Sequence, residues 1–193
     1  MKIIGLTGQT GSGKSHVAFM LRDYGFFHID ADVVAKDVID SNDELKARLT
    51  KEFGRVINAD GSVNRKALAK AAFKDLSTTE LLNSIVDDAV IKRINEIIED
   101  KKAKGYRGVV IDAIALFESG ANGVCDFTIS VIAPKDERLK RILKRDKITK
   151  EEAINRINAQ KDQEFFTEKS DFVVRNYPPY DLKSELLPII NSL

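Results

Sequence analysis

The sequence contains a single cysteine, Cys125, and no long apolar run. One cysteine excludes an internal disulfide and a metal site built from several thiolates. No uncharged apolar stretch approaches the roughly 18 residues that a membrane-spanning helix needs. Basic and acidic residues nearly balance, 31 against 30, for a net charge of +1. Without a bulk positive field, we expect no binding to nucleic acid or to a membrane surface.

The composition is that of a folded globular protein. Hydrophobic residues make up 43% and charged residues 32% of the 193 residues, whereas a disordered chain has far fewer Ile, Leu, Val and Phe. No repeat, low-complexity tract or Pro/Gly/Ser-rich linker divides the sequence, which predicts one domain over residues 1–193. The opening run MKIIGLTG is too short for a signal peptide, so we expect a cytoplasmic protein.

Five short apolar runs predict the strands of a parallel sheet. Their nearly continuous apolar character is typical of strands that are buried on both faces. Helical stretches separate the runs, which indicates right-handed crossovers, helices on both faces of the sheet and an α/β fold. The runs are Lys2–Thr7, Phe26–Ile29, Gly108–Ile111, Phe127–Ile132 and Asp171–Val174.

An inserted helical region is predicted between the second and third runs. These runs lie about 75 residues apart, far more than the dozen or so residues of a minimal crossover. The longest helix of the insertion is predicted from Thr79 to about Lys104, because Leu and Ile residues recur there on one stripe. A turn at Asp60-Gly61 precedes a helix start near Asn64.

Residues 8–15 read GQTGSGKS and match the phosphate-loop pattern G-x-x-x-x-G-K-[ST]. The motif lies between the first strand and a helix predicted over Ser15–Arg22, as its mechanism requires. The glycines let backbone N–H groups point at phosphate oxygens, and the helix N-terminus adds positive charge. Lys14 would reach the β and γ phosphates of a nucleotide, and the hydroxyl of Ser15 would ligate Mg²⁺.

A phosphate loop alone does not separate kinases from GTPases, motor ATPases or switch proteins. The guanine-reading pattern N-K-x-D is absent, and the chain is short for an AAA-type module with its second domain. A small-molecule kinase is therefore the leading interpretation. Such an enzyme needs a carboxylate that takes the proton of the acceptor hydroxyl and cations over the transferred group. The alternative from another class is an ATP-binding regulatory module, which would show no acceptor-stimulated turnover.

Three carboxylates follow predicted strands. Asp30 and Asp32 come after the second strand, and in an extended segment they would project to the same side. Asp112 follows the third strand and is typical of the acid that holds the Mg²⁺ shell. Ligands of open α/β sheets bind outside the carboxyl ends of the strands, so all three could face the phosphate loop. A helix N-cap or a solvated acid is the alternative for each, and spacing does not rank Asp30 against Asp32.

The basic residues are concentrated in one segment. Residues 138–156 carry eight Lys or Arg against three Asp or Glu. The apolar stripe of the predicted helix leaves Arg138, Arg141 and Arg145 together on a different face. An arginine lid that closes over ATP phosphates is one interpretation, and a solvated helix face is another. A nucleic-acid patch is disfavoured, because no aromatic residues are interleaved with the basic ones.

Further motifs along the chain are IDADVVAKDV (29–38), FGRVINADGSVNRKAL (53–68), LFESG (116–120), RILKRDKITKEEAINRINAQ (141–160) and SDFVVRN (170–176). In this order, and after IIGLTGQTGSGKS (3–15), they resemble the motifs of the dephospho-coenzyme A kinase family over essentially the whole chain. The resemblance implies ATP-dependent phosphorylation of the ribose 3′-hydroxyl of dephospho-CoA, the last step of coenzyme A biosynthesis. ATP and dephospho-CoA are then the expected partners, with no obligate protein partner.

The resemblance also implies a fold of P-loop kinase type, with a five-stranded parallel sheet, a helical substrate region and a helical lid. Mg²⁺ is the implied cofactor, held by Ser15 and Asp112. The expected bounds are a core of about 1–32, 106–134 and 168–193, a substrate-binding insertion of about 33–105 and a lid of about 135–167.

Carried over position by position, the resemblance makes Asp32 the base for the 3′-hydroxyl. Asp32, Asp30 and Arg65 are then the substrate-binding residues. The catalytic residues are Asp32, Lys14 and Arg145, of which Arg145 contacts phosphates. In the family, the matching positions of Arg141 and Asn176 lie at the adenine. The implied nucleotide-binding residues are Gly8, Thr10, Gly11, Ser12, Gly13, Lys14, Ser15, Arg141 and Asn176.

The sequence departs from the family pattern at three places. Asp87-Asp88 stands where the family has His-Pro, Ile114-Ala115 where it has Pro-Leu, and Arg138 where it has a glutamine. The first two departures concern the acceptor side and leave the nucleotide half intact. They motivate one alternative, a P-loop kinase for another small hydroxyl or nucleotide acceptor.

Overall fold

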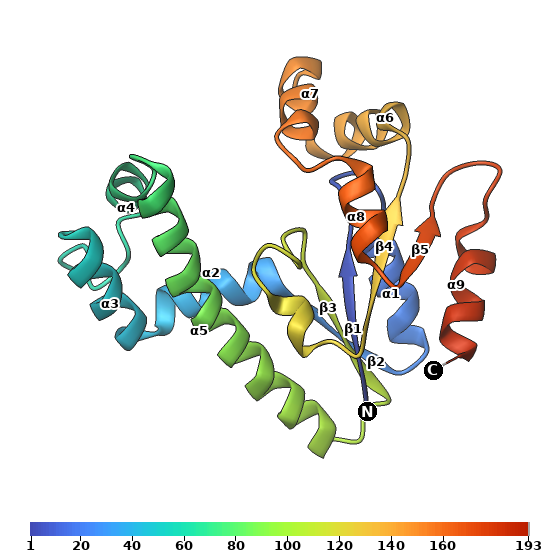
Figure 1. The fold of residues 1–193 in the computed structure, drawn as a ribbon, viewed down its shortest axis with the longest axis horizontal. Helices are drawn as coiled ribbons and strands as arrows, with labels where there is room; N and C mark the ends of the chain where they lie inside the picture. The colour runs from blue at the N-terminus through green and yellow to red at the C-terminus, as the bar shows by residue number, and fades with distance from the viewer. Residues whose placement is uncertain (193) are drawn as a thin grey trace. The chain divides into compact units, whose positions relative to one another are not determined.

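The computed structural model describes residues 1–192, and a five-stranded sheet organises much of the chain (Figure 1). The strand order is β2-β3-β1-β4-β5, and the pairs β1–β3, β1–β4 and β4–β5 are parallel. Every predicted strand is present, and its ends differ from the prediction by no more than one residue. The strands are β1 (Lys2–Thr7), β2 (Phe26–Asp30), β3 (Gly108–Asp112), β4 (Phe127–Ile132) and β5 (Phe172–Arg175).

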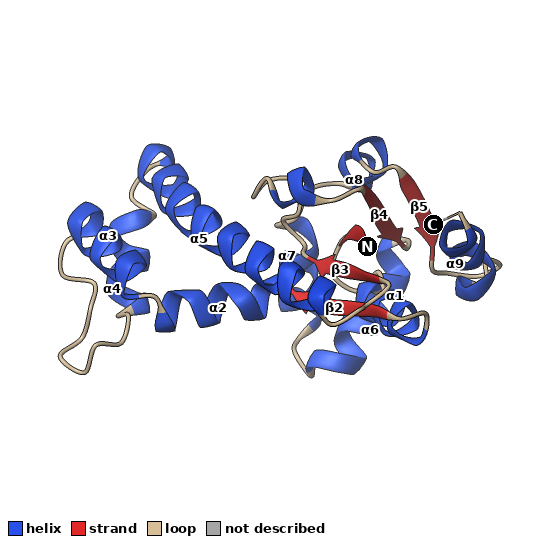
Figure 2. Cartoon of the chain, turned by 90° about the horizontal axis from the view of Figure 1, so that it is seen from below, coloured by secondary structure: helices blue, strands red, loops and turns tan. Residues whose placement is uncertain are grey.

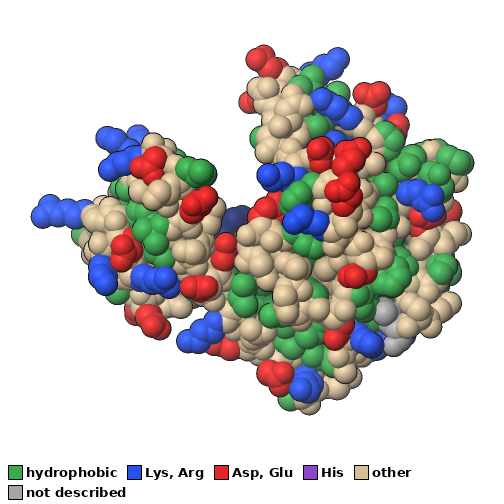
Figure 3. Space-filling view, viewed as in Figure 1, with side chains coloured by type: hydrophobic (Ala, Val, Ile, Leu, Met, Phe, Trp, Pro, Cys, Tyr) green, Lys and Arg blue, Asp and Glu red, His purple; other side chains and the backbone are tan. Residues whose placement is uncertain are grey.

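The chain divides into two compact units. The first, here called the sheet unit, combines Met1–Ile29 with Lys101–Leu193, and the second, here called the helical unit, comprises Asp30–Asp100. Acidic and basic side chains are interspersed on the face shown in Figure 3, as the near-neutral net charge leads one to expect. Within residues 1–192, no helix is both long enough and apolar enough to cross a membrane.

The core of the sheet unit lies between the sheet and two helices, α1 (Lys14–Asp23) and α9 (Leu182–Asn191). Four of the five residues of β3 are buried, and five of the six in β4. This burial explains why the strands read as apolar runs rather than as alternating patterns. The buried residues of this cluster are Ile4, Leu6, Val17, Ala18, Leu21, Phe26, Val110, Ile129, Val131, Val174, Leu186, Ile189 and Ile190.

The helical unit consists of helices linked by loops (Figure 2). Asn42 and Asn64 act as N-caps, because their side-chain oxygens accept the N–H groups of Leu45 and Ala67 at 2.9 Å. The predicted helix start near Asn64 is confirmed. The helices are α2 (Ala31–Ser41), α3 (Asp43–Phe53), α4 (Arg65–Ala72) and α5 (Leu76–Ala103), of which α5 continues into the sheet unit.

The sheet unit also contains a helical segment after β4, with α6 (Lys135–Asp146), α7 (Lys150–Asn158) and α8 (Gln163–Lys169), and the short 3₁₀ helix η1 (Ala121–Val124). A capping box at Thr149 and Glu152 starts α7. A small core of Ile142, Ala153 and Ile157 joins α6 to α7. Packed together in this way, α6 and α7 form a helical hairpin.

The face of α6 that carries Arg138 was left open between a lid and a solvated surface. At Arg138 it is not solvated, because this residue is only 5% exposed. The backbone of Arg138 lies directly against Gly11 of the phosphate loop, so the first turns of α6 are covered on that face. Farther along the helix the same face opens to solvent, where the side chain of Arg145 is 60% exposed.

Candidate active site

The phosphate loop joins β1 to α1 and takes the shape that its glycines allow. Gly8 and Gly13 have φ angles of 135° and 101°, in a region that L side chains rarely adopt. A Cβ on Gly13 would collide with the side chain of Asn176, and one on Gly8 with the backbone of Val131. Glycine is therefore required at both positions by backbone conformation and by space.

One side of the loop backbone is held by two side chains of the sheet unit. Nη1 of Arg141 donates to the carbonyl oxygens of Gly11 at 3.2 Å and Ser12 at 3.1 Å. Nδ2 of Asn176 donates to the Ser12 carbonyl at 2.7 Å, and Nη2 of Arg141 donates to the Asn176 carbonyl at 2.6 Å. The N–H groups of Gly11 and Gly13 have no acceptor within residues 1–192. These two N–H groups are therefore available to donate hydrogen bonds to phosphate oxygens.

Lys14 and Asp112 lie together at the carboxyl end of the sheet. Lys14 Nζ is 3.6 Å from Oδ1 of Asp112, and the two side chains are 12% and 11% exposed. Nε2 of His28, which the sequence did not place in the site, is 3.4 Å from Oδ2 of the same carboxylate. Ser15 is exposed at the start of α1. A serine hydroxyl and a carboxylate are oxygen ligands of the kind Mg²⁺ takes when phosphates and water complete its shell.

A cavity of about 470 Å³ lies beside the loop on the side of α6. Three of its lining residues are basic and none is acidic, which suits an anionic ligand. The lining residues are Gly11, Gly13, Ser15, Arg141, Lys144 and Arg145. The arrangement brings two of the predicted lid arginines to the phosphate loop.

Arg145 is engaged with its neighbour along the chain. Its Nε and Nη2 donate to the carboxylate of Asp146 at 2.6 and 3.0 Å, and Nη1 of Arg156 donates to the same carboxylate at 2.6 Å. The hydrogen bond from Arg145 is the main reason that the pKa of Asp146 is lowered. A phosphate that binds Arg145 must therefore compete with Asp146 for the guanidinium.

Two glutamines that the sequence did not assign to the site, Gln9 within the loop and Gln160 after α7, join the loop to the segment after α7. Oε1 of Gln160 accepts the backbone N–H of Thr10 at 2.8 Å, and Nε2 of Gln9 donates to the carbonyl of Lys161 at 2.8 Å. Gln160 ends the stretch 141–160 that matches the family motif. Its place in this motif was the one sequence signal that Gln160 belongs to the site, because no local pattern links residues about 150 positions apart.

A second cavity, of about 400 Å³, adjoins Gln160. It lies against the segment that follows β3, which contains the departures Ile114 and Ala115. Its polar side chains are one acid, one base and one amide, so it has no net charge. The lining residues are Ile114, Ala115, Glu118, Ala159, Gln160, Lys161 and Phe166.

The predicted substrate residues belong to the helical unit. Oδ1 of Asp30 accepts the N–H of Val33 at 3.1 Å and caps α2. The prediction that Asp30 and Asp32 share an extended segment was wrong, because this cap starts the helix at Ala31 and Asp32 lies in its first turn. Asp32 is exposed there. The guanidinium of Arg65 binds both oxygens of Asp40 at 2.9 Å.

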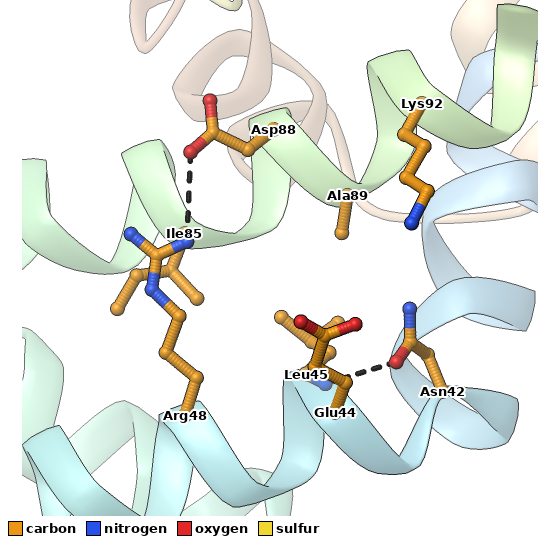
Figure 4. Close-up of a pocket in the computed structure, with 8 residues that line it drawn as sticks. All are labelled: Asn42, Glu44, Leu45, Arg48, Ile85, Asp88, Ala89 and Lys92. Atoms are coloured by element: carbon orange, nitrogen blue, oxygen red, sulfur yellow. Dashed lines mark hydrogen bonds and ion pairs between the residues drawn. The ribbon is translucent and has the colours of Figure 1, made fainter.

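The Asp87-Asp88 departure lies on α5, next to a pocket of about 160 Å³ in the helical unit (Figure 4). Arg48 extends from α3 to Asp88 on α5, at 3.5 Å. Burial, with the charge of Asp88 adding to it, raises the pKa of Asp87 to about 6. The pocket has two acidic and two basic lining residues, so it offers no excess charge to an anion. All the residues that line the pocket are Asn42, Glu44, Leu45, Arg48, Ile85, Asp88, Ala89 and Lys92.

The phosphate loop after the central strand β1, its lysine beside a strand-end carboxylate and the basic helix over the loop define a P-loop kinase. Solved structures have the same fold. A crystal structure of a Thermus thermophilus protein is 29% identical, with a TM-score of 0.78 over 99% of this chain and 96% of that one. Dephospho-CoA kinase from Campylobacter jejuni is 26% identical, with a TM-score of 0.69 over 100% and 97%.

Sequence comparisons name the family. The family model for dephospho-CoA kinase matches residues 2–179. Dephospho-CoA kinase from Moorella thermoacetica is 41% identical over 162 residues, which are 83% of this chain and 76% of the relative. The chain therefore belongs to the dephospho-CoA kinase family. The resemblance seen in the motifs is confirmed, and the chain is a kinase.

Proposed function

We propose that the chain transfers the γ-phosphate of ATP to the ribose 3′-hydroxyl of dephospho-CoA, giving coenzyme A and ADP. The observation that carries this proposal is the phosphate loop: Arg141 and Asn176 hold the carbonyls of Gly11 and Ser12, while the N–H groups of Gly11 and Gly13 have no acceptor within residues 1–192. This arrangement suits a polyphosphate donor. Membership of the family supports dephospho-CoA as the acceptor.

On the donor side, Lys14 neutralises the phosphate being transferred, and the loop N–H groups hold the phosphates in place. Arg145 exchanges the carboxylate of Asp146 for a phosphate, since both anions bind a guanidinium in the same forked way. Mg²⁺ bound with ATP would supply positive charge that offsets the charge of the phosphates. The hydroxyl of Ser15 and the carboxylate of Asp112 are the groups of this chain that fit it.

On the acceptor side, we assign Asp32 as the base that takes the proton of the 3′-hydroxyl. Its exposure in the first turn of α2 leaves its carboxylate accessible to a substrate. Asp30 and Arg65 support substrate binding. We also propose the division of the chain into a substrate region of residues 33–105, a lid of residues 135–167 and the remaining core. A cytoplasmic location and the lack of protein, membrane or nucleic-acid partners are further proposals.

The test is the release of ADP by the purified chain with Mg²⁺ and ATP, with and without dephospho-CoA. We expect strong stimulation and a product heavier than the acceptor by one phosphoryl group. Little stimulation, with binding of ATP intact, would contradict the proposed acceptor and leave the donor site standing.

A second candidate acceptor class follows from one observation. Ile114 and Ala115, where the sequence departs from the family, line the cavity of about 400 Å³ beside Gln160. A different fit at this wall would favour another small hydroxyl or nucleotide acceptor. A panel of nucleosides, nucleotides and small alcohols in the same assay separates the two, because only the second candidate predicts a substrate better than dephospho-CoA.

A further inference from the structure

The lid segment is attached to the phosphate loop at both of its ends. At the α6 end, Arg141 binds the carbonyls of Gly11 and Ser12. At the end that follows α7, Gln160 accepts the N–H of Thr10. A second hydrogen bond, from Gln9 to the carbonyl next to Gln160 in sequence, strengthens this attachment. The side chain of Gln160 is therefore held at the loop by contacts that involve no nucleotide.

These contacts also set the orientation of the Gln160 amide. A glutamine amide has one oxygen that accepts and one NH₂ group that donates. The N–H of Thr10 needs an acceptor, so Oε1 must face Thr10. Nε2 is then left with two N–H groups and has no hydrogen-bond partner within residues 1–192. Gln160 thus presents a free donor next to the phosphate loop.

The order of the strands shows on which side of the loop this donor lies. The cavity with Lys144 and Arg145 lies on the side of α6, together with Asn176, which follows the edge strand β5. The cavity that Gln160 lines is bounded instead by Ile114 to Glu118, the segment that follows β3 on the other side of β1. Asp112, the partner of Lys14, ends the same strand. Gln160 therefore shares its side of the loop with the pair proposed to meet the γ-phosphate.

We propose that Gln160 is a ligand of the terminal phosphate of ATP: Nε2 donates to a γ-phosphate oxygen while Oε1 stays on the N–H of Thr10. The inference rests on ATP being the donor of the proposed function, and it does not depend on the acceptor. A hydrogen bond to a charged oxygen is among the stronger ones. The residue would thus distinguish ATP from ADP and link the γ-phosphate to the end of the lid.

The test compares the binding of ADP and of a non-hydrolysable ATP analogue by calorimetry, without any acceptor. Gln160→Glu keeps an oxygen for Thr10 and removes the donor. We expect its dissociation constant for the analogue to rise about tenfold or more, while that for ADP changes less than about threefold. Unchanged ADP binding also shows that the variant and its phosphate loop are intact.

Two further variants make the comparison specific. Gln163→Glu adds the same negative charge three positions away, at the start of α8, and should bind both nucleotides like the wild type. Gln160→Met removes donor and acceptor without adding charge, and should also lose affinity for the analogue more than for ADP. Equal losses for both nucleotides, no loss, or the same loss in Gln163→Glu would overturn the inference. A wild-type chain that binds neither nucleotide would instead overturn the proposed function.

Discussion

At the scale of single residues, the structure adds contacts for two predicted nucleotide-binding residues. The resemblance to the family implied that Arg141 and Asn176 lie at the adenine. Their side chains also hold the carbonyls of Gly11 and Ser12. We infer that they shape the phosphate loop, because an engaged carbonyl cannot turn inward and repel a phosphate. The sequence could predict the loop itself but not these contacts, which join segments more than a hundred residues apart.

The role of Asp32 can be tested with a nearly isosteric change. Asp32→Asn keeps the size of the side chain and removes its basicity. We expect turnover with dephospho-CoA to fall by at least about a hundredfold, with nearly unchanged ATP affinity. Steady-state kinetics and ATP binding together measure this, and near-normal turnover would remove Asp32 from the role of base.

Arg138 is a buried residue with two unsatisfied nitrogen atoms. Its Nε and Nη1 have no hydrogen bond in the described part of the chain, and burial lowers its pKa. Unpaired buried polar groups cost about 1–3 kcal/mol, so Arg138→Met should raise the melting temperature by several degrees. Thermal unfolding of both proteins measures this difference in melting temperature. Lys140→Met, at an exposed position of the same helix, should change the melting temperature little, and a lower value for Arg138→Met would contradict this account.

Asp87 should make stability depend on pH. Its pKa is raised from 3.8 to about 6 in the folded chain, so the folded state holds the proton more tightly than the unfolded state. Stability is therefore lost as the pH rises through this interval. Asp87→Asn should stabilise the chain more at about pH 7.5 than at about pH 4, measured by thermal unfolding. An equal effect at both pH values would show that Asp87 does not titrate in this way, and Glu80→Gln, at an exposed position of the same helix, serves as control.

At the scale of helices and strands, local sequence signals predicted which elements form better than the residues at which they begin and end. The long helix was predicted from Thr79, but α5 begins at Leu76. The carboxylate of Asp75 accepts the N–H of Thr78 at 2.8 Å and starts the helix earlier. The apolar stripe that carried the prediction contains no information about this polar contact. In the same way, the cap at Asp30 turns a segment expected to be extended into the start of α2.

The cap of α4 offers a test of this kind of contact. Asn64→Ala removes the oxygen that accepts the N–H of Ala67 and should cost about 1 kcal/mol of stability, or about 2–4 °C in melting temperature. Asn64→Asp keeps a capping oxygen and should stay close to the wild type. If both variants melt at the wild-type temperature, the cap contributes nothing measurable.

At the scale of the whole molecule, the sequence predicted the five-stranded parallel sheet and the position of the phosphate loop. Both follow from patterns within short segments. It did not predict that Gln9 and Gln160 join the phosphate loop to the segment after α7, nor the burial of Arg138 against Gly11. These depend on tertiary packing, for which neighbouring residues in the sequence carry no signal. The sequence therefore predicted the phosphate loop, Asp112 and the arginines of α6, but not the contacts that join these segments.

The central claim is that the phosphoryl group goes to the ribose 3′-oxygen of dephospho-CoA. The most direct measurement is a phosphorus–proton correlation spectrum of the product formed by the purified chain from ATP and dephospho-CoA. The account predicts one new phosphorus signal coupled to the ribose 3′ proton. A signal coupled to any other position, or no new phosphorylated product while ATP still binds, would contradict it.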